Sequence, residues 1–509
     1  MAASGMNRWS ALLLLLLPFA AQGAEGWTYS YQGIDVTTTG TPQYAQTLAH
    51  NMRRLDTAIV KVLALNFGDW RPPTHIYAVS PAQLLKLRGS PENVGSEFTT
   101  SGVDNVILME TAGAADSRYW GAYFGYSGSL LLSEGVLRYP NWFQVGVSEV
   151  FGATSIQRDR IKIGGFLAGT VRALYAGPLI PLRTLLRLRA DDPQLRTEPT
   201  GSMYYAECWF LAHQILIERL HGPEFFQYLD LMSSGKSESE AFAASFKVSY
   251  EELDQALAKE VVTKRIGELT VTVPDEPGTA QPVALSAPEL KGRLAELAVT
   301  KGHDLDYGVQ LASEALAVEP ANEHALRALA VAQVRQQKYG EALTSIDRLA
   351  ANASPSAGGY ADSAGVLLAV SQAIANKKVM LQEDPVALAH RAFEDYQHAI
   401  MLDKENVGYW TRFAEALANQ HDVAAAKDFL PKGEQVFYLH PHNPNLARSI
   451  SQMYSQAGDL DGSFKFAVAW QNSALDDKSR DSAASWVSRV KASMEKRDVA
   501  SPTKATQSP

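Results

Sequence analysis

The sequence predicts an α+β N-terminal domain followed by an all-α solenoid of helical repeats. Strand-like alternation and helix-like periods are mixed over residues 25–270, whereas residues 289–493 are helical and repetitive throughout. Four prolines interrupt the segment between them, residues 271–288, which we interpret as a linker. A chain of 509 residues has room for these parts, since one domain takes roughly 100–200 residues.

Residues 1–24 have the composition of a secretory signal peptide. Arg8 precedes the apolar run 11–21, and the small residues Gly23 and Ala24 follow it. The run is about half of the ~20 apolar residues that a membrane-spanning helix needs, so we expect cleavage rather than anchoring. No later segment of the sequence is apolar enough to predict an integral membrane segment.

Net charge and cysteine content limit the classes of binding partner and bear on the cellular compartment. The net charge of -9 disfavours binding to nucleic acid or to an anionic membrane surface. Cys208 is the sole cysteine, so an intramolecular disulfide is excluded. Together with the leader, these features predict a protein that is secreted across the inner membrane into a bacterial periplasm.

The N-terminal domain begins with a predicted strand, because apolar and polar residues alternate over 27–38. After Pro42, apolar residues recur at three- and four-residue spacing as far as Leu63, which predicts a helix with one buried face. The apolar runs 75–79 and 106–109 are bounded by Pro, Ser and Asp and predict buried strands. Longer helices are expected at residues 119–137, 141–154, 202–221 and 223–232.

The C-terminal region resembles a series of tetratricopeptide (TPR) repeats. Within residues 325–355, Leu326 and Ala330 take packing positions of a first helix, and Ala342 and Ile346 take those of a second. Less regular copies before and after this one are marked by Ala312, Ala315, Ala392, Tyr396, Trp410, Phe413, Phe429, Ile450 and Ala467. The resemblance implies four or five stacked helical hairpins whose concave face can dock a peptide or a partner helix.

An ordinary all-helical domain with alanine-rich interfaces is the alternative for this region. Beyond it, residues 494–509 are rich in Ser, Thr, Pro and Lys towards the end, and we expect a disordered tail.

A motif in residues 140–149 is similar to part of a metallopeptidase core. Pro140 and Trp142 form a Pro-x-Trp step, and Gly146 and Glu149 follow at the spacing of the second core helix in "peptidase MA-like" gluzincins. The resemblance implies that Glu149 stands where those enzymes have a zinc-binding carboxylate. It extends over most of residues 27–262 and implies a gluzincin-like fold for the N-terminal domain.

The residues that would make such a core catalytic are absent. The resemblance places the two histidine positions at Phe124 and Gly128, and the general base at Gly125. None of these side chains can bind zinc or accept a proton, and one carboxylate alone holds zinc poorly. His213 and His221 could share a helix face, but we expect His213 to be a packed core residue. We therefore expect no metal, no cofactor and no catalytic residue, as in an inactive peptidase homologue.

These observations favour a secreted, non-catalytic scaffold that binds protein or peptide partners. A former cleft around Phe124, Gly125, Gly128, Trp142 and Glu149, with an exposed strand edge beside it, is one candidate binding site. The solenoid is a second, and two linked weak sites reinforce each other. Two alternatives stay open: a zinc metallopeptidase with ligands elsewhere in the chain, and a structural component of an envelope assembly.

Overall fold

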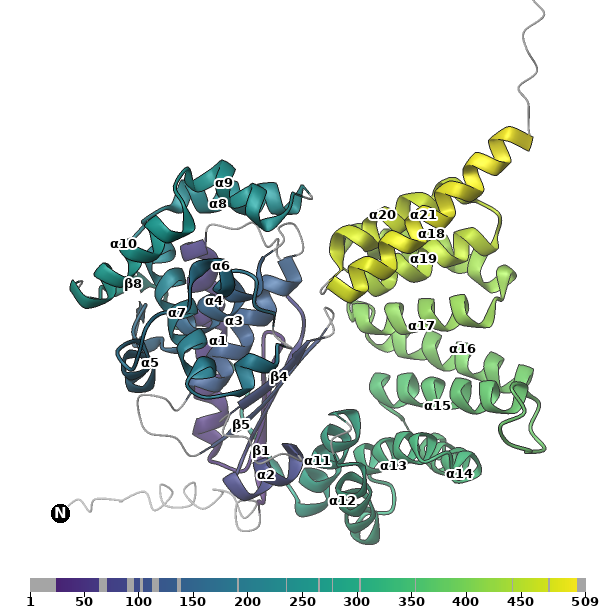
Figure 1. The fold of residues 1–509 in the computed structure, drawn as a ribbon. Coiled ribbons are helices and arrows are strands. Elements are labelled where there is room, and N and C mark those ends of the chain that lie inside the picture. Colours follow the sequence, from purple (N-terminus) through teal and green to yellow (C-terminus); the bar gives the residue numbers. More distant parts are fainter. Residues whose placement is uncertain are drawn as a thin grey trace, which may run out of the picture.

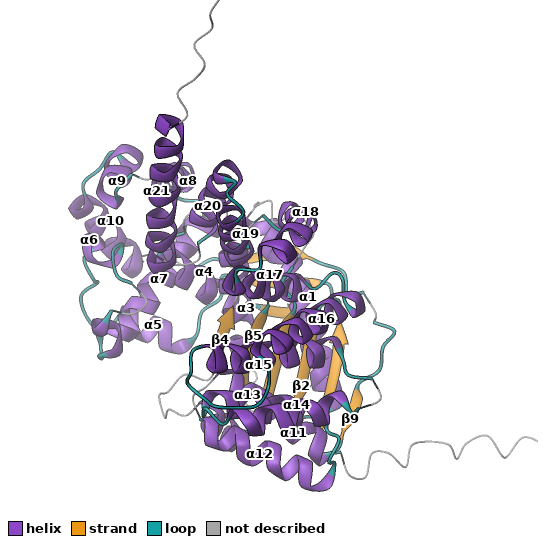
Figure 2. Cartoon of the chain, turned by 90° about the vertical axis from the view of Figure 1, so that its right-hand side faces the viewer, coloured by secondary structure: helices purple, strands orange, loops and turns teal. Residues whose placement is uncertain are grey.

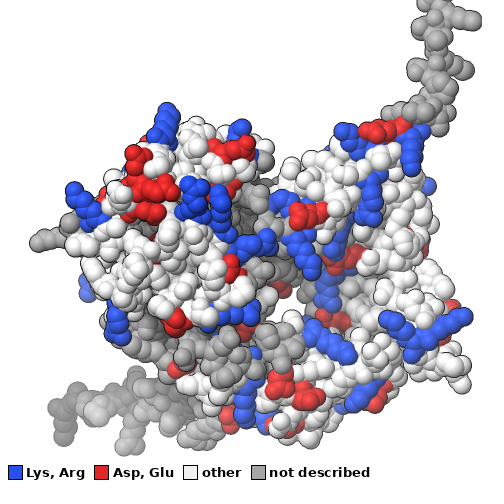
Figure 3. Space-filling view, viewed as in Figure 1, with Lys and Arg blue, Asp and Glu red and all other residues white. Residues whose placement is uncertain are grey.

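The protein has two halves that lie opposite each other, as the computed structural model shows (Figure 1). Its surface is hollowed between them (Figure 3). The structure describes residues 24–500 except for short gaps, which are residues 64–70, 89–95, 101–103, 112–118, 135–138, 190–191, 235, 264–265, 277, 302–303, 353, 442 and 475–476. The predicted signal peptide, apart from residue 24, and residues 501–509 lie outside the described part of the chain.

The N-terminal half starts with mixed strands and helices and continues with helices. Its first elements are β1 (Gly26–Tyr31), β2 (Ile34–Thr38), α1 (Pro42–Leu63), β3 (Thr74–Val79), α2 (Pro81–Arg88), β4 (Ser96–Thr100) and β5 (Asn105–Glu110). The next are α3 (Trp120–Glu134), α4 (Asn141–Gly152), β6 (Ser155–Gln157), β7 (Arg160–Ile163), α5 (Ala168–Leu174), α6 (Leu182–Leu185), η1 (Pro193–Arg196), α7 (Thr200–Leu216), α8 (Gly222–Ser233), α9 (Glu238–Phe246) and α10 (Tyr250–Thr263).

The helices and strands that the periodicity predicted lie close to their expected ranges, but residues 27–38 form a hairpin and not one strand. The two strands are joined at Gln32 and Gly33, which have positive φ angles of 47° and 80°. Two successive residues in this conformation match the twist of a tight hairpin, so the alternating pattern continues on both sides of the turn.

Strands from both ends of this half form one six-stranded sheet in the order β4-β5-β3-β2-β1-β9, where β9 is Val283–Leu285. The central strands β2, β3 and β5 are parallel, and β4 pairs antiparallel with β5 at one edge. Ile34, Ile76 and Ile107 belong to the core that this sheet shares with α1 and α3. One face of the sheet is therefore covered within the N-terminal half.

Parts of the predicted linker, residues 271–288, belong to strands and to a helix that the sequence pattern did not predict. Strand β8 (Leu269–Thr272) completes a small sheet in the order β6-β7-β8, and β9 pairs with β1. Leu285 of β9 is only 3% exposed. Strands of three or four residues between prolines are too short to show a periodicity, which explains why the sequence pattern missed them.

The C-terminal half consists of paired helices that stack along a curve (Figure 1). They are α11 (Ala287–Lys301), α12 (Leu305–Val318), α13 (Glu323–Arg335), α14 (Tyr339–Ala350), α15 (Ala357–Ala375), α16 (Pro385–Leu402), α17 (Val407–Gln420), α18 (Val423–Leu439), α19 (Pro444–Gln456), α20 (Leu460–Ser473) and α21 (Asp477–Ala500). Each odd-numbered helix up to α19 packs against the even-numbered helix that follows and, as far as α17, against the next odd-numbered helix. The prediction of TPR-like helical repeats is confirmed.

The repeat positions chosen from the sequence are the buried ones. Leu326, Ala330, Ala342 and Ile346 are fully buried, and helices α13 and α15 start 34 residues apart, the period of a TPR. The irregular spacing after this unit comes from the long connection between α15 and α16.

The two halves contact each other at both ends of the hollow. At one end, Val79 and Leu108 of the sheet, Leu84 of α2 and Leu290 and Leu294 of α11 belong to the same apolar core. At the other end, Arg189 of the N-terminal half and Lys478, Asp481, Ser482 and Ser485 of α21 line a cavity of about 340 Å³. The hollow is therefore bounded by the chain at both ends.

Helix α21 extends further than the sequence suggested, since residues 494–500 are helical and not part of a disordered tail. Arg497 pairs with Asp461 of α20 at 2.9 Å, and no helix-breaking residue precedes Pro502. Within the described residues, no helix has both the length and the apolar character needed to cross a membrane.

Candidate binding site

The predicted cleft positions on α3 lie against the edge strand β4. A Cβ atom on Gly125 would be 2.8 Å from the Cβ of Phe98, and one on Gly128 would be 2.7 Å from the Ser148 Oγ and 3.6 Å from the Phe98 ring. Phe124 packs against Trp120 with ring centroids 4.9 Å apart and the ring planes tilted by 36°. Phe98 and Ser148 therefore occupy the space beside the positions where the resemblance placed a histidine and a general base.

Glu149, the remaining carboxylate of the motif, is buried on α4 with 7% of its surface exposed. Burial raises the pKa of Glu149 to about 7, and the Trp120 indole partly offsets this rise. The charge of Glu149 in turn contributes to the raised pKa of Tyr205, after burial. Glu149 thus lies in an apolar interface between α3, α4 and α7, where its neutral form is favoured.

Trp142 and His213 both serve as core residues. Trp142 is 3% exposed and packs against Phe143 and Phe225, with ring centroids 5.6 and 5.5 Å away. It lies near the start of α4, two turns before Glu149. His213 is 1% exposed and its Nε2 is 2.9 Å from the Gly267 carbonyl oxygen, as expected for a packed residue. In the described part of the chain, no group of three or more His, Cys, Asp or Glu side chains is placed to hold a metal ion.

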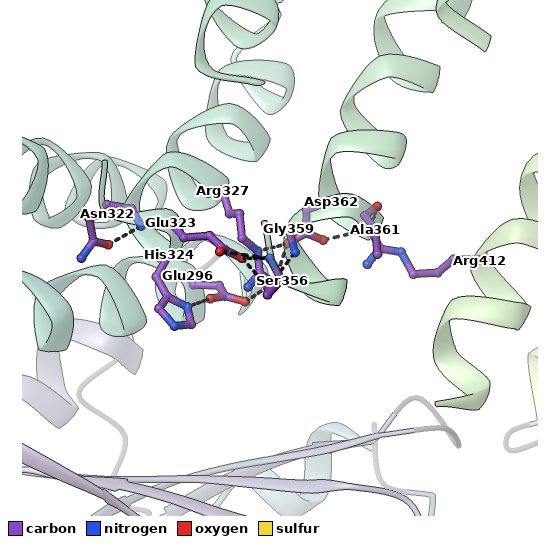
Figure 4. A network of polar contacts seen from close by, with 11 residues as sticks. Glu296, Asn322, Glu323, His324, Arg327, Ser356, Gly359, Ala361, Asp362 and Arg412 are labelled. Atoms are coloured by element: carbon purple, nitrogen blue, oxygen red, sulfur yellow. Dashed lines mark hydrogen bonds and ion pairs between the residues drawn. The ribbon is translucent and has the colours of Figure 1, made fainter. Parts of the chain in front are cut away.

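A second set of polar residues lies on the odd-numbered helices of the solenoid and is centred on Arg327 (Figure 4). Arg327 of α13 donates from Nη2 to Glu296 of α11 and from Nε to Asp362 of α15, both at 2.8 Å. His324 Nδ1 is 2.6 Å from the other oxygen of Glu296. Burial alone would raise the pKa of Glu296, but Arg327 and His324 outweigh it and lower that pKa to about 2. This network ties three successive repeats together.

Two further arginines continue the same face along the solenoid. Arg412 of α17 donates from Nη2 to Asp362 at 2.9 Å and to the Ala361 carbonyl oxygen at 2.8 Å. Arg448 of α19 donates from Nη2 to Glu415 of α17 at 2.7 Å. Their side chains are 38% and 36% exposed, against 12% for Arg327. The arginines on α17 and α19 are therefore more open to solvent than Arg327 on α13.

The face of the sheet turned away from α1 carries a polar pair. His75 Nδ1 of β3 is 3.3 Å from Asp35 Oδ2 of β2, and both side chains are about two-fifths exposed. Burial alone would lower the pKa of His75, but the hydrogen bond and charge of Asp35 outweigh it and raise that pKa. For Asp35, burial acts to raise the pKa, but the hydrogen bonds from His75 and Ser30 outweigh it and lower that pKa. The charged forms of both side chains are therefore favoured, although burial alone would favour their neutral forms.

The polar pair of the sheet lies close to charged residues of α11, the first helix of the solenoid. Glu296 is one of the charges that raise the pKa of His75, and Arg293 is one of those that lower the pKa of Asp35. Seen from the solenoid side, α13 to α17 lie in front of the strands (Figure 2). In the view turned by 90°, the sheet and the solenoid lie opposite each other (Figure 1). The surface is hollowed between the halves, and Lys and Arg side chains gather along this hollow (Figure 3).

Sequence reasoning found the helices of this site but not its residues. The available signal was the repeat itself, because Arg293 and Arg327 are 34 residues apart and Arg412 and Arg448 are 36 apart. Aligning the repeats on their charged positions, and not only on alanines and aromatics, would have shown arginines recurring on first helices. The pair Asp35 and His75 leaves no such signal, since it depends on strand register.

The chain was compared with family models, with curated proteins and with solved structures. No protein-family model matches the sequence, and no curated protein is detectably similar to it. Solved structures that are similar in part include TTC0263, a thermophilic TPR protein of Thermus thermophilus, with 19% identity and a TM-score of 0.32 over 40% of this chain and 99% of that one. YrrB, a TPR protein, follows with 14% identity and a TM-score of 0.29 over 38% of this chain and 91% of that one. The TPR domain of P58(IPK) has 10% identity and a TM-score of 0.18 over 58% of this chain and 86% of that one.

Proposed function

We propose that this protein is a non-catalytic scaffold that holds a protein or peptide partner in the hollow between its sheet and its solenoid. The observation that carries the proposal is that the sheet and the solenoid, which lie opposite each other, both carry partly exposed polar groups: Asp35 and His75 on the sheet, Arg412 and Arg448 on the solenoid. A peptide between two such walls can make hydrogen bonds on both sides.

A rigid frame supports this role. Arg327 joins α11, α13 and α15, and the apolar core continues from the sheet into α11. A surface whose shape is fixed before binding loses less conformational entropy when a partner docks. The edge strand β4 lies beside the hollow and offers a place where an extended peptide can add a strand.

We also propose that the N-terminal half is an inactive relative of gluzincin peptidases and that the protein acts after export, in the periplasm. The support for inactivity is chemical, since Phe124, Gly125 and Gly128 offer no metal ligand or base and Glu149 favours its neutral form. The support for export is the leader-like composition of residues 1–24. About one equivalent of tightly bound zinc in purified protein, lost on Glu149→Gln, would overturn the proposal of inactivity.

Site-specific photo-crosslinking tests the location of the partner. Benzoylphenylalanine replaces either Tyr409 of α17 or Tyr438 of α18. Burial raises the pKa of Tyr409, and Arg327 and Arg412 of the network in Figure 4 partly offset this rise. Tyr438 is 53% exposed. We expect a discrete crosslinked band from position 409 that excess unmodified protein competes away, and none from 438. Crosslinks from 438 alone, or the same bands from both positions, would overturn the proposal.

A further inference from the structure

We propose that the solenoid is anchored at α11 and opens at α21, so that the contact between Arg189 and α21 is a gate through which a partner enters the hollow. This inference rests on the proposed scaffold function and adds how the partner reaches its site. It depends on the different chemistry of the two contacts between the halves.

The contact at α11 is apolar and buried. Leu290 and Leu294 of α11 are 5% and 2% exposed. They share one core with Val79 and Leu108 of the sheet, which are fully buried. The strand that leads into α11, β9, also pairs with β1. Separating the halves at this end would expose apolar side chains to water, which opposes opening.

The contact at α21 is polar and wet. The cavity of about 340 Å³ between the halves is lined by Arg189, Lys478, Asp481, Ser482 and Ser485, and all five residues are exposed. Charged and hydroxyl side chains exchange their mutual hydrogen bonds for bonds to water when two surfaces part. Contacts between exposed charges therefore contribute little to holding this end closed.

The apolar side chains next to the cavity belong to separate cores. Leu185 and Leu188, which precede Arg189, are part of the core of the N-terminal half. Ala483 of α21 is part of the cluster that runs along the solenoid. Apolar packing thus ends on each side of the cavity, and moving α21 away from the N-terminal half leaves both cores intact.

The repeat architecture increases the movement at this end. Arg327 ties α11, α13 and α15 together, so the repeats next to the anchored end form a stiff frame. Beyond them, each repeat contacts mainly its neighbours, and small rotations between successive repeats add up towards α21. The end that is held least tightly is therefore also the end that moves furthest.

A gate determines which partners the hollow can hold. The chain borders the hollow at α11 and again at α21 (Figure 1). A peptide can thread into a closed frame by its free end, whereas a loop of a folded partner has no free end. Opening at α21 admits such a loop, and closing again surrounds it.

Distances between spin labels test the two ends separately, by double electron–electron resonance on the chain from residue 24. Arg196→Cys and Ser488→Cys place exposed labels on the two sides of the gate. Leu85→Cys and Val318→Cys place exposed labels on α2 and α12 at the anchored end. Cys208 is buried and stays unlabelled. We expect a broad distribution with a component longer than the closed structure at the gate, and one narrow distribution at the anchored end.

A charge reversal on α21 should shift the gate in a defined direction. Asp481→Lys places a second cation beside Lys478 and opposite Arg189, and like charges repel. The gate labels should move to longer distances, while the labels at the anchored end should not. Glu495→Lys makes the same change of charge at an exposed residue of the same helix outside the cavity lining, and should leave both distributions unchanged. No shift in Asp481→Lys, or an equal shift at both ends, would overturn the inference.

Locking the gate tests whether the partner enters there. Arg189→Cys and Ser482→Cys line the same cavity and can be bridged by a bismaleimide that a reductant cleaves. With benzoylphenylalanine at position 409, the crosslinked band should fall at least about tenfold in the locked chain, because the open form is no longer populated. The band should return after reduction. The single variant Ser482→Cys, which the same reagent cannot bridge, is the control.

A band of equal strength in the locked chain and in the control would overturn the gate while leaving the proposed function intact, since the partner would then enter elsewhere. Absence of the band in the control would contradict the proposed function itself. The spin-label distances do not depend on a partner, so they still decide whether α21 opens.

Discussion

At the scale of single residues, glycine decides how closely the helices of the N-terminal half approach each other. A Cβ on Gly146 of α4 would overlap the Cys208 carbonyl oxygen of α7 and lie 2.7 Å from the Ala212 Cβ. On α3, Gly125 allows a similarly close approach to Phe98 of β4, and Gly128 allows one to Ser148 of α4. The positions that the resemblance assigned to lost catalytic residues are thus structural contacts in this protein.

Gly146→Ala should therefore destabilise the N-terminal half by about 2 kcal/mol or more, because α4 and α7 must move apart to admit one methyl group. Urea unfolding followed by circular dichroism measures the loss. Gly169→Ala is the matched control, since Gly169 is also helical and a Cβ there meets nothing within 4 Å. It should be neutral or gain up to about 1 kcal/mol from helix propensity. Equal loss in both variants would contradict the packing argument.

Glu149 predicts a specific pH dependence of stability. Its pKa is raised from 4.5 to about 7 by burial, so between these values the unfolded chain has released a proton that the folded chain keeps. Stability contributed by this group is therefore full below about pH 4.5 and falls until about pH 7. Glu149→Gln should remove that fall, gaining on the order of 2–3 kcal/mol over the parent at pH 8 relative to pH 5.

Unfolding of parent and Glu149→Gln at pH 5 and pH 8 measures this difference directly. Glu207, whose pKa burial raises to about 8, is present in both proteins and cancels in the comparison. A difference between parent and variant that does not change with pH would show that Glu149 is solvated.

At the scale of elements, the sequence was informative where a period runs for several turns or where a strand is flanked by turn residues. The helix after Pro42, the buried strands β3 and β5 and the repeat in residues 325–355 were all predicted from such patterns. Strands β4, β8 and β9 have five residues or fewer, and only their partners across the sheet determine them.

The candidate site was predicted less well than the fold, for a related reason. Several of the predicted residues lie on one helix pair, α3 and α4, and are buried in its interface, as Gly128 and Glu149 show. The partly exposed polar residues of the sheet and of the solenoid come from strands and helices far apart in sequence, such as His75 and Arg412. Side chains that meet only through tertiary packing leave no local pattern to recognise.

The role of β9 leads to a prediction about chain cleavage. Cleavage at a protease site introduced at residues 279–281 breaks the covalent link between the N-terminal half and β9. The contacts of β9 with β1 and of α11 with the shared core do not depend on that link. We expect the two fragments to elute together in size-exclusion chromatography without denaturant, because the contact buries apolar side chains. Leu285→Asp, which places a charge at a residue 3% exposed, should weaken this association. Fragments that separate freely in the parent would restore the linker interpretation.

At the scale of the whole molecule, the core does not stop at the boundary between the two halves. One apolar cluster runs from Val79 and Leu108 of the sheet through Leu294 of α11 and along the solenoid to Ala483 of α21. The stability of a repeat array is roughly the sum of the stabilities of its repeats and of the contacts between neighbours. The cluster shared with the sheet adds a further contact to the first repeat. The curvature that shapes the hollow therefore depends on how α11 sits on the sheet.

Leu294→Ala should test this coupling, since Leu294 is 2% exposed and lies in the shared cluster. The cavity it leaves should cost about 2–5 kcal/mol. Because the cluster joins both halves, amide protection measured by hydrogen exchange should fall in β3 as well as in α13, and unfolding should stay a single transition. Leu439→Ala, at a residue 74% exposed on α18, is the control and should change stability by no more than about 0.5 kcal/mol. Protection lost in α13 while β3 keeps its own would show that the two halves unfold independently, and the hollow would then be a gap between two domains with no fixed shape.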